Sequence, residues 1–111
     1  MDATPDNVIN ELHRIQRELD RAPEALYTAE VKLAELESEV DRVESMTFLD
    51  GEGTGQDRAA RAKLAVAPIK LQRDLARAEL NRVKTKIKVL ESAAVSTSVI
   101  GKQVELLWKN A

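Results

Sequence analysis

The stretch VINELHRIQRELDRAPEALYTAEVKLAELESEVDRV, residues 8–43, carries apolar side chains at alternating spacings of three and four. Two series recur every seven positions: Leu12, Leu19, Leu26, Leu33 and Val40, and Val8, Ile15, Ala22, Ala29, Leu36 and Val43. They correspond to the a and d positions of a heptad repeat, which form one apolar seam along a helix. Thr4 can cap the start of this helix, and Pro5 suits its first turn. We therefore predict a helix over about residues 5–46.

Pro23 lies inside this heptad pattern. A proline within a helix removes a backbone hydrogen bond and costs about 3 kcal/mol. The phase of the heptad is nevertheless the same before and after Pro23. The pattern therefore favours one kinked, continuous helix over the alternative of two separate helices.

A weaker heptad follows in the second half, with a positions Ala59, Val66, Arg73, Leu80, Ile87 and Ala94 and d positions Ala62, Ile69, Ala76, Val83, Leu90 and Thr97. It predicts a second helix over about residues 58–95. Serine and threonine cluster at 96–98, and apolar residues then resume at helical spacing. This predicts a short C-terminal helix over about 98–109, or a frayed extension of the second helix. We expect Trp108 to pack against the start of the first helix in preference to binding a ligand.

Three of the four glycines lie in FLDGEGTGQD, residues 48–57, between the two predicted helices. A calcium loop beginning at Asp50 would need a bidentate glutamate at its twelfth position, where this chain has Arg61. We therefore predict a loop over 47–57 that only reverses the chain. The predicted fold is all-α: an antiparallel two-helix coiled-coil hairpin with a short C-terminal helix, forming a single domain over residues 1–111.

Charge is divided unevenly between the two halves of the chain. Residues 1–56 hold 14 acidic and 5 basic residues, whereas residues 57–111 hold 5 acidic and 12 basic residues. The halves should therefore attract each other. Pairing seam positions whose numbers add to 109 places large residues opposite small ones, such as Leu33 opposite Ala76. The ion pairs expected at e positions are Glu44 with Lys63, Glu37 with Lys70, and Glu30 with Arg77.

Composition disfavours several functions. The 111 residues include no cysteine, one histidine, His13, and only 3% aromatic residues. No nucleophile, base and orienting group can be recognised, so we expect no enzyme, metal, cofactor or small-molecule substrate. No apolar run approaches the roughly 18 residues of a membrane span, so we expect no membrane partner. The lack of cysteine fits a cytoplasmic location.

Apolar residues outside the seam indicate where a partner could bind. They are Leu64, Pro68, Leu71, Leu75 and Ala78 on the second helix, and Tyr27 and Val31 on the first. A lone hairpin would leave these residues in water. Self-association as a homodimer, giving a four-helix bundle, is the favoured interpretation. The other is a docking groove for a helix of an unidentified protein. Either makes the chain a protein-interaction or scaffolding module.

The basic second helix permits an alternative function, an accessory factor that binds nucleic acid. Lys84, Lys86 and Lys88 would then contact phosphate groups. The acidic first helix and the few aromatic residues available for base stacking count against this alternative.

An acidic heptad helix, a glycine-containing turn and then TGQDRAARAKL, residues 54–64, follow one another in this chain. This order resembles small helical-hairpin accessory proteins encoded by tailed bacteriophages. The resemblance covers the plan of about residues 30–110, and its local feature is the Arg58, Ala59, Arg61 and Leu64 pattern. It implies a non-enzymatic accessory protein that acts on a host or phage protein, and it assigns no site residues.

Overall fold

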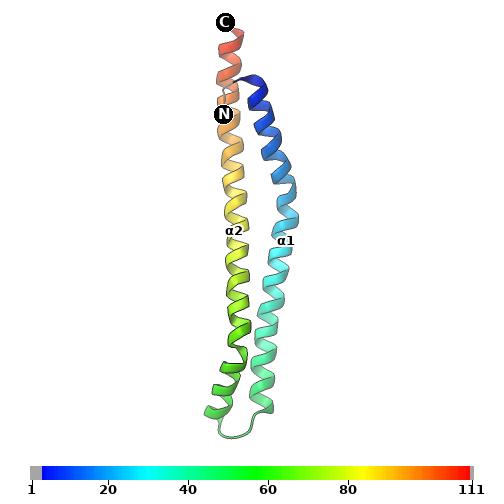
Figure 1. Ribbon diagram of the computed structural model, residues 1–111, viewed down its shortest axis with the longest axis vertical. Coiled ribbons are helices and arrows are strands. Elements are labelled where there is room, and N and C mark those ends of the chain that lie inside the picture. The colour runs from blue at the N-terminus through cyan, green and yellow to red at the C-terminus, as the bar shows by residue number, and fades with distance from the viewer. Residues whose placement is uncertain (1–3, 111) are drawn as a thin grey trace. The chain divides into compact units, whose positions relative to one another are not determined.

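The computed structural model describes residues 4–110, which form two helices and no strand (Figure 1). Helix α1 spans Pro5–Asp50 and helix α2 spans Gly55–Lys109. The chain is thus an all-α helical hairpin, as its heptads predict. It divides into two compact units. The loop unit contains residues 27–82, and the terminal unit contains residues 1–26 and 83–111.

Helix α1 begins where the sequence predicts and ends later. The backbone N–H of Asn7 donates a hydrogen bond to Thr4 Oγ1 at 3.3 Å, which caps the helix. The helix continues through Pro23, which is exposed, so the carbonyl that loses its partner can bind water. The prediction of one continuous helix is therefore confirmed.

A reciprocal cap fixes the start of α2. The N–H of Asp57 donates to Thr54 Oγ1, and the N–H of Thr54 donates to Asp57 Oδ2, both at 3.2 Å. This arrangement is a capping box. The hydrogen bond from the Thr54 N–H is the main cause of the lowered pKa of Asp57. The connection is consequently only residues 51–54, shorter than the predicted 47–57.

The expected separate C-terminal helix is wrong, because α2 runs without a break to Lys109. Thr97 is buried at its d position, whereas Ser96 and Ser98 are exposed, so the polar cluster contributes one residue to the seam and does not end the helix. Trp108 does not pack against the start of α1 as expected, since its exposed fraction is 61%. In the terminal unit, α2 continues past the start of α1 (Figure 1).

The heptad seams form the core of both units. Every buried residue within 4–110 occupies an a or d position. In the terminal unit these are Val8, Ile15, Leu90, Thr97 and Val104, and in the loop unit Ala29, Val40, Ala62, Val66, Ala76 and Leu80. Val66 has an exposed fraction of 0%. The predicted seam is confirmed, and Val104 extends it by one heptad.

Close contact in the terminal unit agrees with the predicted register. A Cβ atom built on Gly101 would lie 2.9 Å from Val8 Cγ1. The two position numbers add to 109, as predicted. Because glycine has no Cβ, the backbone of α2 can approach the Val8 side chain closely at this point.

The ion pairs between α1 and α2 differ from those predicted. In the loop unit, Arg77 pairs with Glu37 at 3.5 Å and Lys70 pairs with Glu44 at 3.9 Å. Each acid thus pairs with the base seven residues beyond the predicted one. The cause is that helical side chains lean toward the N-terminus of their own helix.

In the loop unit, this lean brings together residues that lie slightly C-terminal of directly facing positions on both helices. Glu44 and Lys70 therefore lean toward each other, whereas Glu44 and Lys63 lean apart. The same rule places Gly51 opposite Lys63, so that lysine lacks an acidic partner within residues 4–110. The pair of Glu18 with Lys86 in the terminal unit, whose position numbers add to 104, does not follow this rule.

Arg73 occupies an a position of the seam, yet its charge is not buried. Its guanidinium Nη2 lies 2.9 Å from Asp74 Oδ1, and its side chain is half-buried. The aliphatic stem can therefore cover the seam while the charged end reaches an exposed carboxylate.

Gly53 has φ of 96°, and a Cβ at this position would lie 2.9 Å from Asp57 Oδ2. We predict that Gly53→Ala lowers the free energy of unfolding by more than about 1 kcal/mol, because alanine is strained at positive φ. Gly55→Ala is the matched control, since no atom lies within 4 Å of its added methyl group. Urea denaturation followed by circular dichroism measures both. Equal effects would contradict the loop geometry.

The revised ion pairs can be tested by double-mutant cycles. We predict that Glu37→Lys and Arg77→Glu show a coupling free energy of about 0.2–1 kcal/mol, the range for exposed pairs. Glu37→Lys combined with Lys70→Glu should show less, because these side chains lean apart. Both cycles are measured by urea denaturation at low salt. A larger coupling free energy between Glu37 and Lys70 would contradict the observed ion pairs and favour the pairs predicted from the sequence.

Candidate protein-interaction surface

The five apolar residues predicted outside the seam of α2 form one continuous strip. We call Leu64, Pro68, Leu71, Leu75 and Ala78 the outer stripe. Their spacing alternates between four and three residues, which places them on one side of the helix. All five are exposed, and the exposed fractions of the three leucines are 76%, 61% and 62% in chain order. The structure thus brings these predicted interface residues together within the loop unit.

The outer stripe lies on the side of α2 that faces away from α1. Its members occupy c and f positions, whose centre is about 160° around the helix from the a and d positions at 3.6 residues per turn. The seam buries Val66 and Leu80 on the other side of the same helix. Within the hairpin, α1 therefore leaves the leucines of the outer stripe mostly exposed.

Uncharged residues border the centre of the outer stripe. Ala65, Ala67 and Gln72 occupy the neighbouring b and g positions. Alanines permit a close approach by another helix, and the absence of charge lowers the cost of desolvation. This composition is suited to burial by a partner.

Charged groups lie at the two ends of the outer stripe. Arg61 precedes it and donates a hydrogen bond to the backbone carbonyl of Asp57 at 3.4 Å. Asp74 and Glu79 lie near the other end. Glu79 accepts hydrogen bonds from Arg82 at 2.7 and 2.9 Å, which lower the pKa of its carboxyl group. Arg61 also interacts electrostatically with the Asp57 carboxylate, whose pKa it helps to lower.

An open groove of about 830 Å³ runs beside the outer stripe in the loop unit. Leu36 of α1 and Ala76 of α2 line it together with Leu75, which also belongs to the outer stripe. Glu35, Glu39 and Glu79 also border it. The groove is apolar at its base and mainly acidic at its rim, which would suit a helix with basic flanks.

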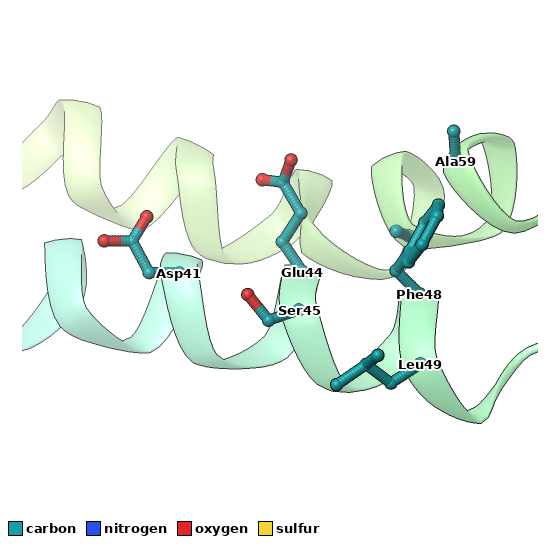
Figure 2. A pocket seen from close by; sticks show the side chains of 7 residues that line it. Asp41, Glu44, Ser45, Phe48, Leu49 and Ala59 are labelled. Atoms are coloured by element: carbon teal, nitrogen blue, oxygen red, sulfur yellow. The ribbon is translucent and has the colours of Figure 1, made fainter. Parts of the chain in front are cut away.

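A second hollow of about 550 Å³ lies near the connection between the helices (Figure 2). Phe48 points from α1 toward α2, and Leu49 lies on the outer side of α1. Asp41 and Glu44 contribute acidic groups. The sequence analysis missed this hollow because it placed residues 48 and 49 in the loop, whereas α1 continues to Asp50.

Tyr27 and Val31, the smaller predicted patch, do not join the outer stripe. They occupy b and f positions of α1, on the side that faces away from α2. Tyr27 is exposed and Val31 is half-buried. In the loop unit, these residues and the outer stripe therefore lie on opposite sides.

The three lysines of the nucleic-acid alternative do not form one basic surface. Successive residues turn by about 100°, so Lys84 and Lys88 lie close together around α2, whereas Lys86 is on nearly the opposite side. All three are exposed, and Lys86 Nζ lies 3.9 Å from Glu18 Oε2. Only two of the three lysines could contact the same phosphate backbone.

Two further properties concern residues 4–110. No group of three or more His, Asp or Glu side chains in this part of the chain is arranged to hold a metal ion. Neither α1 nor α2 contains a stretch that is long and apolar enough to cross a membrane.

Comparison with protein-family models, curated proteins and solved structures found no match to this chain. The resemblance to phage-encoded hairpin proteins stays a prediction.

Proposed function

We propose that this protein is a non-enzymatic interaction or scaffolding module that acts in the cytoplasm and binds a protein through the outer stripe. One observation carries the proposal: three exposed leucines lie on the side of α2 opposite the seam. The seam already buries the other apolar side of α2. The outer stripe therefore has no partner within the hairpin.

The favoured partner is a second copy of the chain, so that two hairpins form a four-helix assembly. Fully burying an exposed leucine contributes about 1.5–3 kcal/mol. Three leucines would contribute about 5–9 kcal/mol, and association costs about 4–15 kcal/mol. These two terms are similar in size. A homodimer held by this surface should therefore depend on protein concentration.

The resemblance to phage-encoded accessory proteins supports a second step, in which the assembled module acts on a host or phage protein. Glu35 and Glu39 of α1 do not belong to the outer stripe and would receive a basic helix of such a protein. Nucleic acid is the less supported partner, because Lys86 lies across α2 from Lys84 and Lys88 and pairs with Glu18.

We predict that Leu71→Glu shifts the protein to monomer, because a charge would have to be desolvated at the centre of the interface. Val89→Glu is the matched control, since Val89 has the same exposed fraction of 61% but lies outside the outer stripe. Light scattering coupled to size-exclusion chromatography measures the mass over a range of protein concentrations.

Circular dichroism should show unchanged helix content in both variants.

Dimerisation by the apolar stripe should persist at high salt, whereas binding to nucleic acid would weaken steeply. If the unmodified protein is monomeric at all accessible concentrations, self-association is excluded. If Leu71→Glu and Val89→Glu dimerise equally well, the outer stripe is not the interface.

A further inference from the structure

We infer that the outer stripe packs against the same stripe of a second copy in the antiparallel direction, with a two-fold axis beside Leu71. The inference rests on the proposed function and specifies the partner surface and its orientation. It depends on the spacing of the stripe, the charges at its ends and its position on α2.

The spacing of the outer stripe is nearly symmetrical about Leu71. Its other members lie seven and three residues before Leu71 and four and seven residues after it. Two antiparallel stripes centred on Leu71 therefore place Leu64 against Ala78 and Pro68 against Leu75, while Leu71 meets its own copy. Large side chains then face small ones on both sides of the central pair, which close packing requires.

A parallel arrangement would also bring apolar residues together, but it would set each charge beside its own copy. Arg61 would face Arg61, and Glu79 would face Glu79, at a cost in repulsion. The antiparallel arrangement places Arg61 of one copy opposite Arg82 of the other, but the charge of Arg82 is compensated by Glu79, whose Oε1 lies 2.7 Å from Arg82 Nη2. Each Glu79 carboxylate then lies between two guanidinium groups.

The other acid near the outer stripe is also accommodated. Asp74 would face the uncharged Ala67 of the second copy, and its carboxylate is already paired with Arg73 at 2.9 Å and Arg77 at 3.7 Å. Arg61, which interacts with the Asp57 carboxylate of its own chain, gains a second carboxylate nearby in Glu79 of the other copy. Charge therefore selects the antiparallel orientation.

Because the outer stripe lies opposite the seam, the two loop units would meet α2 against α2. The α2 segments would occupy the middle of the assembly, and each α1 segment would lie on the far side of its own α2. The acidic surface of α1 would then remain exposed on both sides, available for a different partner.

Single cysteines can test the orientation, because the chain has none of its own. Leu71→Cys should form a disulfide-linked dimer on mild oxidation, since the two sulfurs would meet at the axis. Leu64→Cys and Ala78→Cys should each form few linked dimers alone, but an equal mixture of the two should link up to about half of its dimers, because random exchange makes half of them mixed pairs. Val89→Cys measures the background from random collisions. Non-reducing electrophoresis of all five samples measures the fraction of linked dimer.

Equal linking by Leu64→Cys, Leu71→Cys and Ala78→Cys when each is oxidised alone would overturn the antiparallel inference and indicate parallel pairing. Linking no greater than that of Val89→Cys at every stripe position would show that the outer stripe is not the interface. Light scattering on the reduced samples shows whether a dimer forms at all. It therefore separates a wrong orientation from a failure of the proposed function. A dimer with the wrong cross-linking pattern defeats only the orientation, whereas a monomer defeats self-association as well.

Discussion

Burial of two heptad seams against each other is the interaction on which the structure depends. With so few aromatic residues, the chain has no thick core, and each helix buries only one narrow side. Val66 and Ile15 are the largest fully buried side chains, one in each unit. The outer stripe follows from this restriction, since its apolar residues lie outside the a and d positions and remain exposed until another molecule covers them.

The ion pairs between α1 and α2 leave the outer stripe largely uncharged. Glu37 and Glu44 of α1 pair with Arg77 and Lys70 of α2, so these bases are directed toward the hairpin's own partner helix. The outer side of α2 retains leucine, alanine, proline and glutamine at its centre. An acidic helix and a basic helix thus combine to leave an apolar, largely uncharged surface on one of them.

The heptads predicted both helices and the residues of the seam, because burial repeats with the period of the helix. They also predicted that Leu64, Leu71 and Leu75 would be exposed, since these positions lie away from the seam. The ion pairs were missed because they depend on the direction in which side chains lean, which spacing alone does not include. The start of α2 could have been recognised from the Thr-x-x-Asp pattern at residue 54.

Other features required the folded chain. The groove beside Leu75 combines residues from both helices, and its shape depends on how deeply small residues such as Ala76 are placed between them. The separation of Tyr27 from the outer stripe also follows from the pairing of α1 with α2. The separate C-terminal helix was predicted wrongly because the polar composition at 96–98 favours a loop, whereas burial of Thr97 in the seam supports a continuous helix.

The most direct test of the account is to cross-link α1 to α2 at the contact between Val8 and Gly101. The double variant Val8→Cys with Gly101→Cys should form a disulfide within one chain, because these positions approach closely in the terminal unit. Ile9→Cys with Gly101→Cys should not, since Ile9 is exposed beside the seam. Mass spectrometry and non-reducing electrophoresis should show an oxidised monomer. A disulfide found only between chains would mean that the seams pair between copies and would contradict the hairpin.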